Sequence, residues 1–128
     1  MFRVLLVDDD ESLRQLIVHK LKQDFGFVTD EASSGFDAIK LIKQGIKYSL
    51  IISDYNMPDG NGADLQDFLV ENNIPSYFFF YTSEAQVKVN QSHQRFVGVI
   101  QKPNIEQLFT ELVFKICTSN LKKNGLVF

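Results

Sequence analysis

The sequence predicts an α/β fold, because short apolar runs alternate with segments whose apolar residues recur at helical spacing. A second observation points the same way: several of the apolar runs end in an acid, a lysine or a threonine. With 128 residues, 45% of them hydrophobic and 23% charged, the chain is long enough for one domain with a buried core.

Five segments are predicted to be strands, and all but the second are mainly apolar. They are residues 2–7, 27–31, 48–53, 77–82 and 96–101. The fourth begins with five aromatic residues in a row, from Tyr77 to Tyr81. Because these aromatics do not alternate with polar residues, this strand is predicted to be covered on both faces.

Capping and breaking residues mark the first two predicted helices. An acid at position 10 or 11 stands at the start of the first helix, and Gly26 ends it. Ser34 with Asp37 resembles a capping box at the start of the second helix, which stops at Gly45. The residues predicted to face the core are Leu13, Leu16, Ile17, Leu21, Ala38, Leu41 and Ile42.

The last three predicted helices differ in strength. The third carries Leu65, Phe68 and Leu69. Ser83 with Gln86 could cap a fourth, but residues 87–94 have no clean apolar stripe, so that helix is expected to be short or weakly anchored. The fifth has the best stripe and should end near Thr118; its apolar residues are Ile105, Leu108, Phe109, Leu112, Val113 and Ile116, with Asn104 and Gln107 as its expected cap.

Strict alternation of strands and helices predicts a doubly wound, five-stranded parallel sheet with helices on both faces. In the flavodoxin-like strand order 2-1-3-4-5, the first, third, fourth and fifth strands are neighbours, and their carboxyl ends meet at one edge. That edge would gather Asp8, Asp9, Asp54, Thr82 and Lys102.

Such a cluster favours phosphoryl chemistry. At about 4.5 Å and an effective dielectric constant near 20, two carboxylates repel each other by roughly 4 kcal/mol, so the acids should shift their pKa values or bind a cation. Carboxylate oxygens suit Mg²⁺, with Mn²⁺ as an alternative. Lys102 and Thr82 could hold two oxygens of a phosphoryl group on Asp54, since a carboxylate can act as the nucleophile.

Four motifs resemble the receiver domain of two-component response regulators. They are Val7-Asp8-Asp9, residues 54–60 (Asp-Tyr-Asn-Met-Pro-Asp-Gly), Thr82-Ser83 and Lys102-Pro103. They occur in the family's order and near its spacing, and the resemblance runs from about Phe2 to Thr118. It implies a receiver domain at 1–118, followed at 119–128 by a tail or the start of a linker.

The resemblance implies a role for each site residue. Asp54 would be the phosphoacceptor, Asp9 a direct Mg²⁺ ligand, Asp8 a ligand mostly through water, and the main-chain carbonyl of Asn56 a further ligand. Thr82 and Lys102 would bind the phosphoryl group and report its arrival. Ser83 would leave access for the donor, and Pro103 would support the lysine.

The resemblance also implies a signalling phosphoprotein rather than an enzyme with an external substrate. It would accept its phosphoryl group from a histidine kinase or a histidine phosphotransfer protein and lose it slowly by itself. An output domain or a downstream protein would receive the signal, and a homodimer is left open. The net charge of −3 gives no basic surface for nucleic acid, no apolar run is long enough for a membrane span, and the single Cys117 fits the cytoplasm.

Two alternatives compete. Asp8-x-Asp10-x-Ser12 resembles the nucleophile motif of haloacid-dehalogenase-type phosphatases, in which Asp8 would carry the phosphoryl group. Those enzymes need a second acidic pair after the lysine, and none follows Lys102 at a strand end. A pseudo-receiver that only binds partners is the other alternative, and the complete set of acids, threonine and lysine argues against it.

Two further expectations concern signal output and the histidines. Many receivers carry an aromatic residue where this chain has Val99, which is too short and stiff to swing between exposed and buried positions. Output is therefore expected to run through the fourth helix, on the side formed with the fifth strand and the fifth helix. His19 and His93 are both expected to be solvated.

Overall fold

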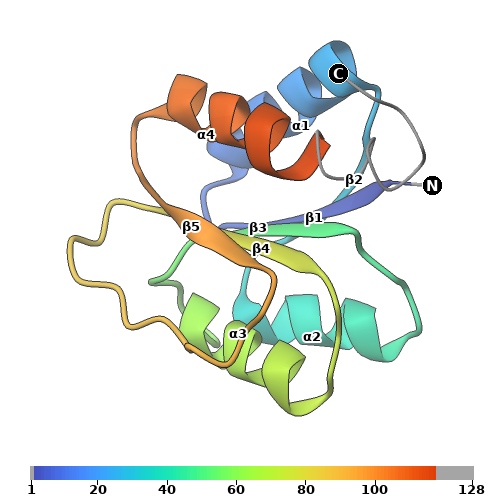
Figure 1. Ribbon diagram of the computed structural model, residues 1–128, viewed down its shortest axis with the longest axis vertical. Coiled ribbons are helices and arrows are strands. Elements are labelled where there is room, and N and C mark those ends of the chain that lie inside the picture. Colours follow the sequence, from blue (N-terminus) through green and yellow to red (C-terminus); the bar gives the residue numbers. More distant parts are fainter. Residues whose placement is uncertain (1, 118–128) are drawn as a thin grey trace.

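The structure, a computed structural model, describes residues 2–117 and shows the predicted five-stranded parallel sheet in the order β2-β1-β3-β4-β5. Helices α1 and α4 cover one face, and α2 and α3 cover the other (Figure 1). The strands are β1 (Arg3–Val7), β2 (Val28–Ala32), β3 (Leu50–Ser53), β4 (Tyr77–Thr82) and β5 (Phe96–Gln101). The helices are α1 (Glu11–Phe25), α2 (Gly35–Lys43), α3 (Gly62–Glu71) and α4 (Ile105–Glu111), which continues as a π-helix, η1 (Leu112–Cys117). The predicted end of the last helix near Thr118 and the predicted tail at 119–128 lie outside the described residues.

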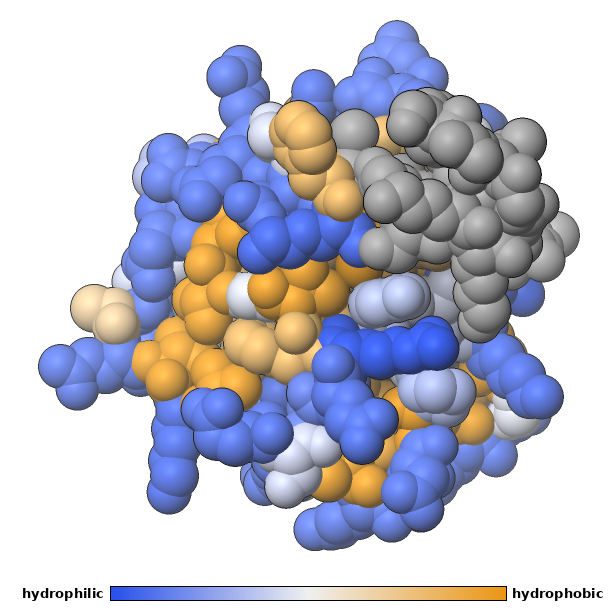
Figure 2. Space-filling model, in the orientation of Figure 1, coloured by the Kyte–Doolittle hydropathy of each residue, from blue (hydrophilic) through white to orange (hydrophobic). Residues whose placement is uncertain are grey.

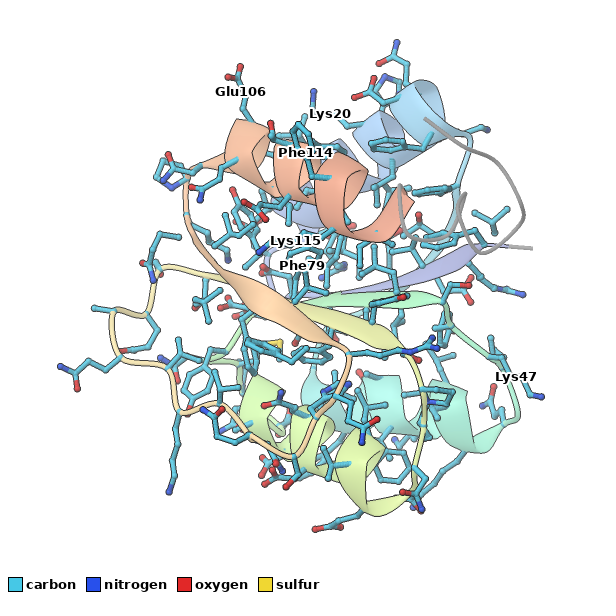
Figure 3. The ribbon with its side chains drawn as sticks, in the orientation of Figure 1. Lys20, Lys47, Phe79, Glu106, Phe114 and Lys115 are labelled. Carbon is cyan, nitrogen blue, oxygen red and sulfur yellow. The ribbon has the colours of Figure 1, made fainter. Side chains whose placement is uncertain are left out.

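Strand β4 is buried on both faces, as its aromatic run predicts. Phe79 and Tyr81 belong to the cluster shared with α1 and α4, and Phe79 lies on the α4 side of the sheet (Figure 3). Phe78 and Phe80 belong to the opposite cluster, shared with α2 and α3. The period-two alternation of a strand therefore divides one aromatic run between two cores, one on each side of the sheet.

The predicted helix boundaries are mostly confirmed by hydrogen bonds. The Asp10 carboxylate accepts a bond from the Leu13 amide at 3.1 Å, and Gly26 ends α1 in the left-handed conformation, with φ of 71°. The Ser34 hydroxyl likewise accepts a bond from the Asp37 amide at 3.1 Å. The predicted cap of α4 is wrong in one respect, since the Asn104 side chain makes no capping bond.

The inward placement of Leu16 is wrong, because its side chain is 50% exposed. In α1, Leu13, Ile17 and Leu21, spaced four apart, meet the core, and Val18 and Phe25 also pack against it. Leu16 precedes Ile17 and is rotated from it by about 100° around the helix axis, so it points away from the sheet.

The predicted fourth helix is also wrong. Residues 83–95, which we call the 83–95 segment, contain bends, turns and irregular chain but no helix, although the structure describes every one of them. Val87 and Val89 both pack against the core cluster of α2 and α3. Apolar residues two apart face the same side only in extended chain, so the sequence here follows the period of a strand.

The 83–95 segment leaves the carboxyl end of β4 and returns along α3 before β5 begins (Figure 1). Two main-chain amides in its middle donate hydrogen bonds to side chains of other segments. The Lys88 amide donates to the Tyr55 hydroxyl at 3.3 Å, and the Asn90 main-chain amide donates to Gln66 Oε1 at 2.8 Å. Near its end lies His93, for which the expectation of a solvated ring is wrong, because the residue is only 9% exposed. Long-range polar contacts thus replace the packing of a helix.

The face of the molecule seen in Figure 2 is mainly hydrophilic around its edge. Figure 2 shows apolar atoms grouped over the middle of the visible face, with hydrophilic residues around them. Phe114 on η1 is 71% exposed and lies on the outer side of the helix layer (Figure 3). Among residues 2–117, no helix has the length and apolar character needed to cross a membrane.

The close approach of α3 to β3 gives a test of this packing. A Cβ built on Gly62, the first residue of α3, would overlap the Asp54 carbonyl oxygen and lie 2.7 Å from the Phe80 ring. We expect Gly62→Ala to lower the free energy of unfolding by about 1–3 kcal/mol. Gly98→Ala is the matched control, because a Cβ there meets nothing within 4 Å, and it should stay within about 0.5 kcal/mol of wild type. Urea denaturation measures both; equal midpoints for the two variants would contradict this packing.

Candidate functional site

The polar residues at the strand ends meet at one edge of the sheet. Val7 of β1 pairs with Ser53 of β3, so Asp8 and Asp54 leave the sheet at the same level. On the other side, Thr82 at the end of β4 pairs with Gln101 of β5, and Lys102 follows. The parallel register thus brings together residues from four separate parts of the chain.

Three carboxylates converge at this edge. One oxygen from each of Asp8, Asp9 and Asp54 lies within 4.8 Å of the others. Asp8 is 2% exposed and Asp54 8%, whereas Asp9 is exposed to solvent. The cluster is therefore buried on one side and open on the other.

Lys102 bridges the two buried acids. Its Nζ atom donates to Asp8 Oδ2 at 2.8 Å and to Asp54 Oδ2 at 3.0 Å. Burial raises the pKa of Asp8, and the hydrogen bond and charge of Lys102 offset that rise only in part. Burial lowers the pKa of Lys102, but its bonds to Asp8 and Asp54 outweigh burial and hold the pKa above its ordinary value. With three acids and one lysine, the cluster keeps an excess of negative charge.

Main-chain amides fix the other oxygen of each buried acid. The Tyr55 amide donates to Asp54 Oδ1 at 2.7 Å, and the Asp10 amide donates to Asp8 Oδ1 at 2.9 Å. Arg14 of α1 donates to the main-chain carbonyl of Asp8 and pairs with Glu31. These contacts hold the carboxylates in place with one side facing the lysine.

Thr82 lies beside the cluster and is 1% exposed. Its hydroxyl oxygen accepts a bond from the Glu84 amide at 3.1 Å, and its carbonyl accepts one from the Lys102 amide at 2.9 Å. Ser83 and Pro103 are exposed next to Thr82 and Lys102, and the Lys102–Pro103 peptide bond is cis. Thr82 thus connects Lys102, at the end of β5, to the beginning of the 83–95 segment.

Asn56 lies on the open side of the site. Its side-chain amide donates to the Glu84 carboxylate, and the Glu84 carbonyl accepts a bond from Gln101 at 3.0 Å. Glu84, Arg14 and the Tyr55 amide are parts of the site that could not be identified from the sequence. Nothing in their local sequence marks them, because each reaches the site only through the folding of a distant segment or through the main chain.

The residues present fit a hard divalent cation. The donor set consists of three carboxylates, one of them exposed, and such oxygens suit Mg²⁺ or Mn²⁺ better than softer metals. The phosphatase alternative fits less well. Between residue 103 and residue 117 the only acids are Glu106 and Glu111, both on α4 and neither at a strand end.

Comparison with known proteins agrees with the geometry. The family model of the response regulator receiver domain matches residues 4–113. Chemotaxis protein CheY of Pseudomonas aeruginosa is 28% identical over 119 residues, which cover 89% of this chain and 94% of that protein. The matches to two other curated relatives cover about half of the length of those proteins, 52% of one and 48% of the other.

Solved structures show the same fold. A signal receiver domain from Vibrio parahaemolyticus superposes with a TM-score of 0.80 at 29% identity, over 98% of each chain. Response regulator TrrA of Thermotoga maritima, solved in complex with Mg²⁺-BeF, superposes with a TM-score of 0.75 at 24% identity, over 88% of this chain and 97% of that one. The family match over most of the chain, together with the acids and lysine at the strand ends, shows that this chain belongs to the receiver domains of response regulators, the signalling domains of two-component systems.

Proposed function

We propose that this receiver accepts a phosphoryl group on Asp54 from the phosphohistidine of a histidine kinase or a histidine phosphotransfer protein. The observation that carries the proposal is the position of the Asp54 carboxylate. It is buried at a strand end, 3.0 Å from the Lys102 ammonium and within the cluster of Asp8 and Asp9. A nucleophile and the positive charge for a phosphoryl group therefore stand together.

The chemistry follows from these groups. An oxygen of Asp54 bonds to phosphorus as the phosphorus–nitrogen bond of the donor breaks; the electron pair stays on the imidazole, which takes up a proton. The Lys102 ammonium can move from the two carboxylates to a phosphoryl oxygen. Attack of water on the same phosphorus releases inorganic phosphate and restores Asp54. These two reactions are the only catalysis that we assign to the domain.

Asp8, Asp9 and Asp54, with the main-chain carbonyl of Asn56, are the proposed ligands of Mg²⁺, with Mn²⁺ as the alternative. When bound, the cation would offset the excess negative charge of the acids and bind an oxygen of the phosphoryl group. The complex of the Thermotoga maritima protein with Mg²⁺-BeF supports this choice of metal. The ligand set itself is proposed from the acids of this chain.

Thr82 is proposed to report the phosphoryl group to the 83–95 segment. Its hydroxyl now accepts a bond from the Glu84 amide, so turning toward a phosphoryl oxygen changes a contact at the start of that segment. Ser83, small and exposed, leaves the donor a path, and Pro103 supports the turn that carries Lys102. Val99 on β5 is too short to act as a swinging aromatic residue.

Output is therefore proposed to pass through the 83–95 segment, on the side that it forms with β5 and α4. We propose that a further domain or a downstream protein in the cytoplasm takes up this output. A homodimer of this domain is one form that the output could take. We propose no nucleic-acid contact by this domain, because its net charge is −3.

The phosphoacceptor is tested by the intact mass of the protein after incubation with acetyl phosphate and Mg²⁺. We expect wild type to gain one phosphoryl group and Asp54→Asn to gain none, since the amide is no nucleophile. Asp59→Asn, which removes an exposed acid five residues away, is the matched control and should be labelled like wild type. A labelled Asp54→Asn protein would refute Asp54 as the acceptor. A label that remains in Asp54→Asn but is lost in Asp8→Asn would favour the phosphatase alternative.

Output is tested by amide hydrogen exchange with and without Mg²⁺ and beryllofluoride, which stands in for the phosphoryl group. Protection should change mainly in the 83–95 segment, because Thr82 contacts its first residues and the segment is held to α3 by hydrogen bonds to side chains rather than by the packing of a helix. The face formed by α1 and β2 serves as the internal control. Changes confined to that face, with the segment unchanged, would show that the output path is wrong.

A further inference from the structure

A buried polar pair lies at the far end of the 83–95 segment and takes no part in the phosphoryl chemistry. Gln66 of α3 is fully buried, and His93 of the segment is 9% exposed. The Gln66 amide nitrogen lies 3.4 Å from His93 Nδ1, and His93 Nε2 lies 3.1 Å from the carbonyl oxygen of Ser76. One imidazole thus connects the segment to both α3 and the start of β4.

The partners fix where the protons are. The main-chain N–H of Asn90 can only donate, and it donates to Gln66 Oε1 at 2.8 Å. The NH₂ group of Gln66 therefore faces His93. His93 Nδ1 must therefore accept, and it carries no hydrogen. Because the Ser76 carbonyl can only accept, the hydrogen is on Nε2. The neutral Nε2–H form of His93 satisfies every one of these contacts.

A second proton would break this arrangement. On Nδ1 it would point at the NH₂ group of Gln66, so that two donors face each other. Rotating the Gln66 amide would relieve that clash, but its NH₂ group would then face the Asn90 amide. In either case the segment loses one of the bonds that hold it to α3.

The surroundings of the ring disfavour the charged form. The Phe78 ring lies 5.6 Å from the imidazole, centroid to centroid. Two charged residues of the neighbouring segments bond to groups other than the ring: Asp67 accepts a bond from the Asn90 side chain, and Arg95 donates to the Pro75 carbonyl. Burial lowers the pKa of His93, and its bond to the Ser76 carbonyl opposes that change only in part.

We propose that His93 is a protonation-controlled anchor of the 83–95 segment: neutral, it holds the segment against α3 and β4, and protonated, it releases the segment. Mild acid would then loosen the chain that follows Thr82 and flanks the candidate phosphoacceptor site. This regulation goes beyond the proposed function and does not require phosphorylation to occur.

The sign of the pH effect follows from the preference for the neutral ring. Because the folded protein binds the proton less readily than the unfolded chain, the unfolded chain takes up more protons below its pKa of about 6.5. The stability that His93 contributes is therefore present above that pH. It is lost as the pH falls through the lower pKa of the folded state.

The test is an NMR pH titration of the full chain without metal or phosphoryl donor, so its outcome is independent of phosphorylation. We expect ¹⁵N shifts of the imidazole to show the Nε2–H form at neutral pH. We expect the ring to titrate below its value in the urea-unfolded protein. Amide shifts of residues 83–95 should move together with the ring. In His93→Gln that shared movement should vanish, whereas His19→Gln, which changes the other histidine on the exposed side of α1, should retain it.

Two results would overturn the proposal. One is a His93 ring that titrates at or above its value in the unfolded chain, a measurement made on wild type that remains valid if His93→Gln fails to fold. The other is a pH response of residues 83–95 that is the same in His93→Gln as in wild type.

Discussion

The arrangement of charge around Lys102 is the interaction on which the rest of the site depends. A parallel sheet brings the ends of its central strands together, and here those ends carry Asp8, Asp9 and Asp54. Without a cation the acids would repel one another at a place where burial already disfavours charge. The lysine at the end of β5 contacts both buried acids, so the edge strand is tied electrostatically to the centre of the sheet. The same lysine is the group that a phosphoryl oxygen would draw away.

Hydrogen bonds connect Lys102 and the cluster of acids with the 83–95 segment. The Lys102 amide donates to the Thr82 carbonyl, and the Thr82 hydroxyl accepts from the Glu84 amide. A shift of the lysine or of the threonine therefore acts on the start of the segment. The other end is anchored by His93, which contacts Gln66 of α3 and the Ser76 carbonyl just before β4. The segment is thus in contact with the site at one end and with a buried histidine at the other.

The sheet and the strand-end cluster could be predicted because they depend on local signals. Mainly apolar runs followed by polar residues predict four of the five strands and the edge at which Asp54 and Lys102 meet. The 83–95 segment could not be predicted as it is, because Val87 and Val89 read as a weak helix and only their shared core contact reveals extended chain. His93 was misjudged for a related reason. Its neighbours in sequence are polar, and the residues that bury it, such as Gln66 and Phe78, come from other elements.

Charge compensation by Lys102 is tested most directly by the free energy of unfolding in EDTA and in Mg²⁺. In EDTA, Lys102→Met should cost about 2 kcal/mol, because two buried acids then lack their cation. Lys115→Met, which breaks an exposed pair with Glu111, is the control and should cost at most about 1 kcal/mol. Mg²⁺ should stabilise Lys102→Met more than wild type, since a bound cation then neutralises acids that the lysine no longer contacts. A Lys102→Met protein as stable as wild type in EDTA and indifferent to Mg²⁺ would contradict this account.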